Sequence, residues 1–277
     1  GTMFPLRKGN KFSIITTFKN SEARGDCEVG NTVDASTISS PNLPKEGTLV
    51  FSPLEVRLPK RTLVWVDRRG GVMPVSTSQR LYHSPALLWR DTHVAVTIGL
   101  EPDSEVFVLD VERDVWTRVN AGPWSLVTAW LPRGQHLLTV SGSLSLRAGP
   151  TLKLVAIDDS APPQTLREGI SNHPGVAPDG RSVLLSVQPG ADDWDIWRLP
   201  LDGDRVAAPW LATAAGGLYP SFSGDGRFVG YGSNESGIPE VYVRPYSGPG
   251  PPQQVSRSGA TRVRWSRDGR EIFYRTE

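Results

Sequence analysis

The sequence contains a single cysteine, Cys27, so it cannot form an internal disulfide framework. It has no surplus of either charge, since 30 Lys and Arg balance 29 Asp and Glu, and no general attraction to nucleic acid or anionic lipid follows. No stretch approaches the roughly 20 apolar residues that cross a membrane. The apolar run at 12–18 is too short for a signal peptide and lacks a small-residue cleavage site. The partners we expect are therefore a protein or a small ligand, with no nucleic acid and no membrane insertion.

Glycine and proline are plentiful, at 28 and 24 residues, and they recur in a fixed pattern. Each copy of the pattern centres on an Asp-Gly pair or its equivalent, and an apolar residue stands four positions earlier in every copy. We call the glycine of each pair, or the residue in its place, the marker of that copy. Successive markers are separated by 44, 43, 46, 46 and 43 residues, which indicates an internal repeat. The markers are Gly47, Asp91, Gly134, Gly180, Gly226 and Gly269.

Each copy contains four short segments of strand-like alternation. One segment leads into the Asp-Gly turn, a second follows it, a third comes after a variable loop, as in "SEVFVLD" at 104–110, and a weaker fourth precedes the next copy. Asp and Gly suit the turn because Asp bonds its own backbone and Gly accepts positive φ. Four antiparallel strands in about 40 to 45 residues are typical of a propeller blade. The pattern predicts an all-β, six-bladed propeller.

The blade boundaries follow from the markers. We place the propeller at 35–277, with blades at 35–80, 81–124, 125–170, 171–217 and 218–260 and a partial blade at 261–277. Because an open half-blade would leave unpaired strand edges, we expect residues 1–34, with candidate strands at 11–18 and 26–30, to complete the last blade. The alternative is that 1–34 is a leader and the sixth blade stays partial.

The repeats "HPGVAPDGRSVLLSV", "YPSFSGDGRFVGYGSNESGIPEVYVRPYSG" and "VRWSRDGREIFYR" resemble those of TolB-like propellers. They are most similar to the propeller that follows the kinase domain in some bacterial serine/threonine kinases. The resemblance implies a six-bladed, bacterial, periplasmic or otherwise extracytoplasmic interaction module without a transferable catalytic set. The kinase itself is excluded from this chain, which lacks a glycine-rich loop and the His-Arg-Asp and Asp-Phe-Gly motifs.

Propeller topology predicts where a site lies. Residues just before the first strands gather around one mouth of the central channel, and the loops between second and third strands surround it. Trp124, Ser125 and Tyr219 are our candidates for contact with a ligand or partner, together with Asp193 and Glu235 in the neighbouring loops. The alternative interpretation is that these are solvated loop residues.

The alternative function is hydrolysis of a small ester or lactone at this mouth. His83 or His173 would act as general base, and Arg262 would stabilise negative charge. Spacing alone selects no nucleophile, so a binding module without catalysis is the preferred prediction.

No cofactor is predicted. The carboxylates of "GADDWDIW" at 190–197 offer oxygen ligands to calcium, but the twelve-residue calcium loop is absent and a polar loop is the simpler interpretation. Zinc is disfavoured because one cysteine and four scattered histidines lack ligand spacing.

Overall fold

The computed structural model describes the backbone of residues 14–16 and residues 60–277, except 68–69, 89–91, 101–102, 123, 143–149, 170–172, 189–193, 249, 267 and 277. Every regular element in this part of the chain is a β-strand. The predicted all-β class is therefore confirmed. Our expectations for the first blade before Lys60 and for Asp193 fall outside the described residues.

Four sheets contain four antiparallel strands each. The first consists of β4 (Tyr82–Leu87), β5 (His93–Ile98), β6 (Glu105–Asp110) and β7 (Val115–Val119). The second consists of β8 (Ser125–Trp130), β9 (His136–Ser141), β10 (Thr151–Ala156) and β11 (Gln164–Arg167). The third consists of β12 (Gly175–Val176), β13 (Ser182–Val187), β14 (Asp195–Pro200) and β15 (Ala208–Leu211). The fourth consists of β16 (Leu218–Phe222), β17 (Phe228–Ser233), β18 (Glu240–Pro245) and β19 (Gln253–Gln254).

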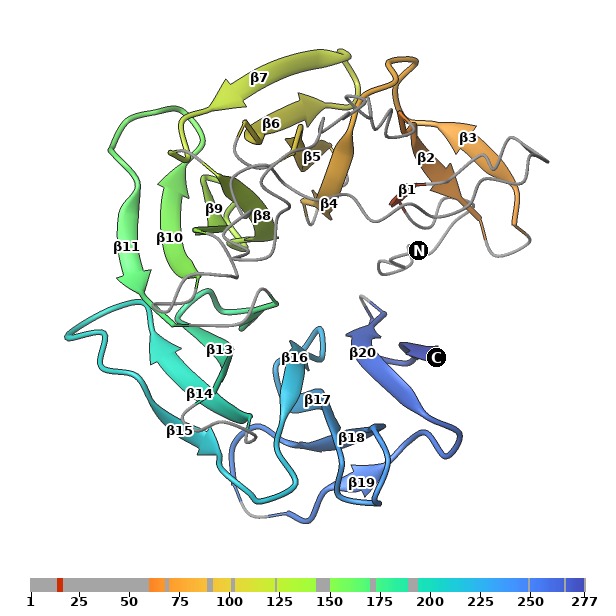
Figure 1. Ribbon diagram of the computed structural model, residues 1–277, viewed down its shortest axis with the longest axis vertical. Helices are drawn as coiled ribbons and strands as arrows, with labels where there is room; N and C mark the ends of the chain where they lie inside the picture. The colour runs from red at the N-terminus through yellow and green to blue at the C-terminus, as the bar shows by residue number, and fades with distance from the viewer. Residues whose placement is uncertain are drawn as a thin grey trace, which may run out of the picture. The chain divides into compact units, whose positions relative to one another are not determined.

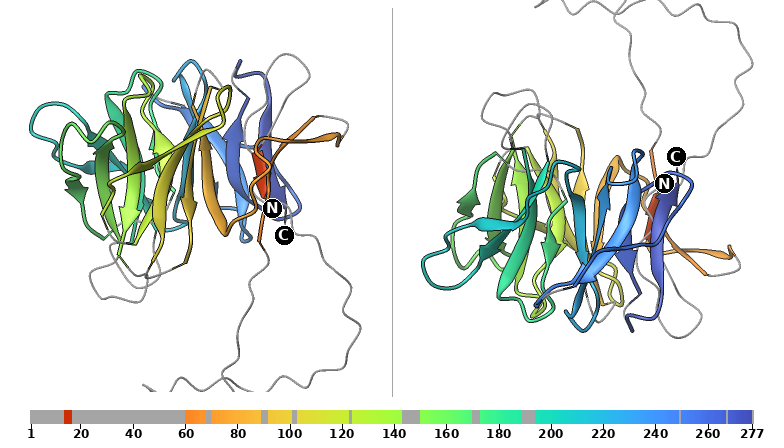
Figure 2. Two further views of the ribbon diagram at one scale, coloured as in Figure 1. Left: turned by 90° about the horizontal axis from the view of Figure 1, so that it is seen from above. Right: turned by 90° about the horizontal axis from the view of Figure 1, so that it is seen from below.

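Two smaller sheets complete the described strands. One joins β1 (Ile14–Thr16), β2 (Leu63–Val66) and β3 (Val72–Pro74), and the other joins β20 (Ala260–Trp265) and β21 (Ile272–Thr276). The sheets succeed one another around a common centre, with β4, β8, β16 and β20 nearest to it (Figure 1). Seen from the side, neighbouring sheets stand next to one another around this centre (Figure 2). The arrangement is that of a propeller with four complete blades.

The N-terminal strand departs from our expectation. We predicted that 11–18 would pair in the last blade, but β1 pairs antiparallel with β2, with Ile15 opposite Val64. It occupies the side of β2 where the repeat places the strand that follows Gly47. An unpaired strand edge accepts any short segment of suitable alternation, and the repeat pattern does not distinguish one such segment from another.

The Asp-Gly turns form as the sequence predicts. Gly180, Gly226 and Gly269 have φ of 70°, 73° and 69°. In the turn of the fourth complete blade, the Oδ1 of Asp225 accepts the backbone N–H of Arg227 at 3.0 Å and the hydroxyl of Ser223 at 2.6 Å. These bonds hold the pKa of the Asp225 carboxyl well below its usual range. The turn residues are therefore structural.

Apolar side chains fill the space between successive sheets. For example, Leu138 and Leu152 of the second complete blade pack with Val183 and Leu185 of the third, and all four are fully buried. Face-to-face packing of two sheets depends on such interdigitating side chains. Close packing of this kind joins neighbouring sheets into the frame on which the channel residues stand.

Candidate functional site

Three side chains from successive blades form a row near the centre of the ring. His173 lies just before β12, Tyr219 is in β16 and Arg262 is in β20. The rings of His173 and Tyr219 are 5.1 Å apart with an interplanar angle of 56°, and the guanidinium of Arg262 lies 5.2 Å from the centre of the Tyr219 ring. The structure thus brings together three residues that the sequence predicted at the channel mouth. The Arg262–Tyr219 arrangement is a cation–π contact.

The members of the row hold equivalent positions in the repeat, and two of them share a backbone feature. His173, Tyr219 and Arg262 each stand seven residues before their marker, as does Ser84 in β4. Ser84, Tyr219 and Arg262 have φ of 46°, 56° and 52°, a left-handed conformation that is uncommon for residues other than glycine. In β4, β16 and β20 the pairing register shifts at this point, as a β-bulge requires. Bulges of this kind re-aim a side chain, here toward the channel.

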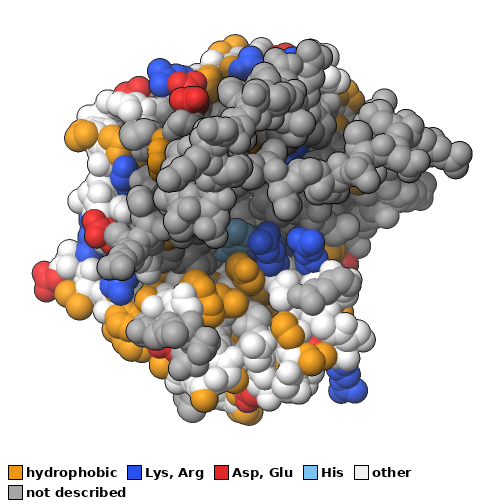
Figure 3. Space-filling model, in the orientation of Figure 1, with side chains coloured by type: hydrophobic (Ala, Val, Ile, Leu, Met, Phe, Trp, Pro, Cys, Tyr) orange, Lys and Arg blue, Asp and Glu red, His pale blue; other side chains and the backbone are white. Residues whose placement is uncertain are grey.

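Positive charge gathers around this row. Figure 3 shows Lys or Arg side chains next to a histidine near the middle of one face. Arg264 lies two residues after Arg262 and is half-buried, and burial followed by the Arg262 charge lowers the pKa of its guanidinium. Arginine remains protonated at neutral pH even so. Two neighbouring guanidinium groups in a partly desolvated position favour an anionic ligand.

A second histidine of the mouth, His83 in β4, is held by Arg61. A guanidinium N–H of Arg61 donates to the backbone oxygen of Tyr82 at 3.0 Å and approaches the Nδ1 of His83 at 3.4 Å. Burial, and then the Arg61 charge, lower the pKa of His83. Because a guanidinium can only donate, Nδ1 is the acceptor and the proton of the neutral ring is on Nε2. In this tautomer Nε2 is protonated, and it is buried without a hydrogen-bond partner among the described residues, an arrangement that does not suit general-base catalysis.

The remaining predicted residues are placed differently. Trp124 is half-buried with φ of 55°. Ser125 is fully buried, and its hydroxyl donates to the backbone oxygen of Ala121 at 2.8 Å, so it fixes the link between two blades. Glu235 is exposed in the loop between β17 and β18. Their assignment as ligand contacts stays a prediction.

The described residues contain no group of three or more His, Cys, Asp or Glu side chains that could hold a metal ion. They also contain no helix of the length and apolarity that a membrane span needs.

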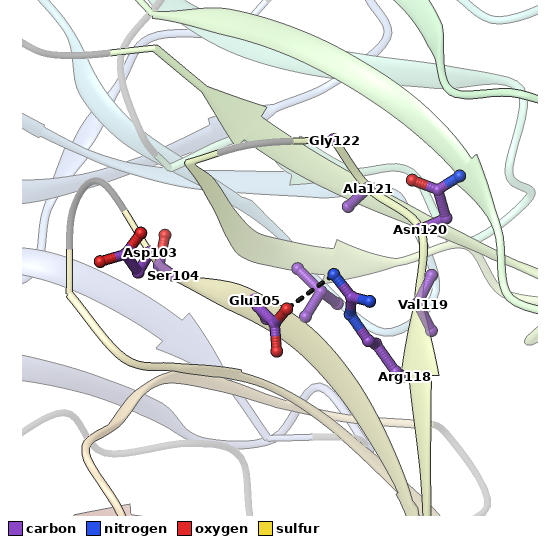
Figure 4. Close-up of a pocket in the computed structure, with 9 residues that line it drawn as sticks. Asp103, Ser104, Glu105, Arg118, Val119, Asn120, Ala121 and Gly122 are labelled. Carbon is purple, nitrogen blue, oxygen red and sulfur yellow. Dashed lines mark ion pairs between the residues drawn. The ribbon is translucent and has the colours of Figure 1, made fainter.

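A separate pocket of about 340 Å³ opens beside the first complete blade. Its polar wall comes from the β5–β6 loop, the end of β7 and the link to β8 (Figure 4). Arg118 and Glu105 form an ion pair across it at 2.6 Å. None of the residues that line this pocket was among our predicted ligand contacts, so Ser104, Arg118 and Asn120 were missed. The signal that could have identified them is a difference between repeats, since Ala121 stands where the fourth complete blade has Ser256.

Comparison with known proteins identifies the fold. No family model and no curated protein matches the chain. Among solved structures, a TolB protein from Agrobacterium tumefaciens superposes with a TM-score of 0.61 at 16% identity, over 74% of this chain and 73% of that one. TolB from Acinetobacter baumannii gives 0.52 at 14% identity, over 78% of this chain and 48% of that one. The β-propeller domain of the Trilobed protease from Pyrococcus furiosus gives 0.54 at 12% identity, over 78% and 68%.

These likenesses define a fold. The chain has a β-propeller fold, and its structural neighbours include TolB-like proteins and the propeller domains of proteases. At such low identities the likeness shows the fold and leaves the activity to the site itself.

Proposed function

We propose that the protein is a non-catalytic binding module that holds an anionic group of a protein partner or small ligand at the mouth of its central channel. The observation that carries the proposal is the row of His173, Tyr219 and Arg262, which three successive blades present on equivalent positions. Arg264 adds positive charge beside Arg262, Arg61 adds positive charge beside His83, and Tyr219 supplies a flat surface for an apolar part of the ligand.

Binding is preferred to hydrolysis because of how the polar groups are arranged. The contacts of His83 place a donor, not an acceptor, on its Nδ1 side. In the neutral tautomer that this contact favours, Nε2 of His83 carries the proton and lacks the lone pair that a general base uses.

The test is a peptide-binding measurement. Fluorescein-labelled tetraglutamate, tetraglutamine and tetralysine peptides are titrated with the protein and followed by anisotropy. We expect the acidic peptide to bind best and Arg262→Ala to weaken its binding by about tenfold. Arg270→Ala removes an exposed arginine from a turn and serves as the matched control. Equal binding of the three peptides, or equal loss in both variants, would contradict the proposal.

The six-bladed ring also belongs to this proposal. The two-stranded β20–β21 sheet would be the start of a sixth blade, completed by a strand from the segment that precedes β2, such as the predicted strand at 26–30. Closure would pair the strand edges that a two-stranded sheet leaves open, and folded proteins normally avoid such open edges. Limited proteolysis tests it, because rapid cleavage within 18–34 in the folded protein would contradict closure. The kinase-linked relationship suggested by the repeats stays a prediction.

A further inference from the structure

The sequence contains four Asp-Gly pairs and no Asn-Gly pair. An Asp-Gly bond is chemically reactive because glycine has no Cβ that would keep its main-chain nitrogen away from the carboxyl carbon of the preceding aspartate. Three of the pairs form turns at the repeat markers, which we call the marker turns, and the fourth lies elsewhere. The marker turns contain Asp179-Gly180, Asp225-Gly226 and Asp268-Gly269, and the fourth pair is Asp202-Gly203. All four aspartates are exposed, so exposure alone does not distinguish them.

In the marker turns, hydrogen bonds hold both of the groups that would react. The carboxylate Oδ1 of Asp179, Asp225 and Asp268 accepts the backbone N–H two residues later, at 2.9, 3.0 and 3.2 Å respectively. The N–H of the following glycine donates to the backbone oxygen three residues before it, at 2.8, 2.9 and 3.0 Å. A bond between the glycine nitrogen and the carboxyl carbon can form only after these hydrogen bonds break, so it requires the turn to open.

A serine adds a further bond in two of these turns. The hydroxyl of Ser223 donates to Asp225 at 2.6 Å. The hydroxyl of Ser266 donates to Asp268 at 2.7 Å, whereas the turn of Asp179 has an alanine at this place. These hydroxyls, followed by the backbone N–H bonds, lower the pKa of the Asp225 and Asp268 carboxyls. Because only a protonated carboxyl readily loses its oxygen as water, the serines protect these two aspartates further.

The Asp202-Gly203 pair lies outside any such turn, in the loop at 201–207 between β14 and β15 of the third complete blade. Both residues are exposed, and a Cβ on Gly203 would meet no atom within 4 Å. The Nε–H of Arg205 ties the loop to the backbone oxygen of Leu201 at 3.0 Å, a bond that involves neither reacting group. Among the described residues, none donates a hydrogen bond to the Asp202 carboxylate and none accepts one from the Gly203 N–H.

We propose that Asp202 is a site of spontaneous isoaspartate formation, from which the marker turns protect the other three Asp-Gly pairs. The nitrogen of Gly203 bonds to Cγ of the protonated Asp202 carboxyl, and the carboxyl hydroxyl leaves with the amide proton as water, which gives a five-membered succinimide. Water then opens this ring. Addition at Cγ restores aspartate, whereas addition at the main-chain carbonyl carbon routes the chain through Cγ and frees the α-carboxylate. One water is lost and one is gained, so no other reactant is needed.

The surrounding blade can accommodate the product. An isoaspartate lengthens the main chain by one methylene group. The pairing of β14 with β15 ends with Arg198 opposite Ala208, so Asp202 lies in the loop beyond the ladder. We therefore expect the isoaspartyl protein to stay folded.

The test follows the oxygen atom that ring opening introduces. The protein is incubated at neutral pH in water enriched in oxygen-18, returned to ordinary water, digested and analysed by peptide mass spectrometry. Each ring opening leaves one heavy oxygen in the peptide, whether aspartate or isoaspartate results. Trypsin releases residues 199–205, which contain Asp202-Gly203 and no other Asp-Gly pair. The same incubation in guanidinium chloride gives the reactivity of each pair in the unfolded chain.

In the folded protein, we expect Asp202 to take up heavy oxygen about tenfold faster than any marker turn. Asp179, which lacks the serine, should be the fastest of the three turns. In the unfolded chain, the four pairs should differ by no more than about threefold, because glycine follows the aspartate in each. Ser223→Ala should speed the labelling of Asp225, and unchanged labelling of Asp268 in the same sample shows that the variant stays folded.

Equal labelling of all four pairs in the folded protein would overturn the proposal, as would a marker turn that labels faster than Asp202. The same holds if Asp202 of the folded protein stays unlabelled while the unfolded chain is labelled. If Asp225 of folded Ser223→Ala labels like the wild type, the turn hydrogen bonds do not protect it.

Discussion

The indole of Trp130 connects two blades, and its loss should destabilise the protein by a calculable amount. Trp130 is 8% exposed, and its Nε1–H donates to the backbone oxygen of Ala86 in the preceding blade at 2.9 Å. Trp265, the equivalent residue four before its own marker, donates to the oxygen of Ser221 at 3.1 Å. Blade-to-blade contact in this fold therefore includes a repeated polar link in addition to apolar packing.

The expected loss of stability in Trp130→Phe has two contributions. Trp130→Phe removes the hydrogen bond and leaves the Ala86 oxygen without it, at a cost of about 1 to 2 kcal/mol. Replacement of the indole by a smaller ring adds about 1 kcal/mol for lost packing. The free energy of unfolding should fall by about 2 to 3 kcal/mol, which corresponds to a fall in melting temperature of about 4 to 12 °C for a domain of this size.

Trp197 offers a matched control. Its indole N–H is buried and has no hydrogen-bond partner in the described structure, and its ring lies 4.9 Å from the Arg167 guanidinium. Trp197→Phe keeps an aromatic ring there and removes an unsatisfied donor, so we expect a loss of about 1 kcal/mol or less. Urea unfolding of both variants makes the comparison. If Trp130→Phe loses no more stability than Trp197→Phe, the inter-blade hydrogen bond does not stabilise the fold.

Three further outcomes are expected. Gly175→Ala should lower the free energy of unfolding by about 2 kcal/mol or more in urea unfolding, because the new Cβ would lie 2.5 Å from the backbone oxygen of Pro220. Gly232→Ala is the control. Its Cβ would lie 3.8 Å from the nearest atom, the backbone oxygen of Leu218, so we expect it to be tolerated. Burial and the Arg61 charge lower the pKa of His83 below the 6.5 of the unfolded chain. The contribution of neutral His83 to stability is therefore complete above about pH 6.5 and falls as the pH drops below it. In His83→Gln the melting temperature should fall less steeply with decreasing pH. Purified protein should show no saturable turnover of chromogenic esters or lactones, and turnover lost in His83→Ala would instead support the hydrolase.

The repeat could be read from sequence because each copy repeats the same local requirement. Asp-Gly pairs specify a tight turn by themselves, and the left-handed φ of Gly180, Gly226 and Gly269 confirms it. The mouth residues followed from topology, since equivalent positions in successive blades must adjoin. Their chemistry did not follow, because the Arg61 contact that fixes the His83 tautomer joins residues 22 apart in sequence.

Two other features could not be predicted from the sequence, for a different reason. The pairing of Ile14–Thr16 with β2 depends on which of several short apolar segments takes a free edge, and alternation does not rank them. The pocket at Glu105 is lined by Ala121, where the fourth complete blade has Ser256, and a search for repeated features passes over such a difference.

The bulge in three of the first strands places very different side chains on the same backbone conformation. Ser84, Tyr219 and Arg262 share φ between 46° and 56° although one is small, one aromatic and one charged, so the register shift and not the side chain sets the backbone. We expect that a substitution there by a residue that tolerates positive φ leaves the pairing of the neighbouring strands unchanged. The specificity of the mouth can therefore evolve, or be redesigned, one blade at a time on a scaffold that stays fixed.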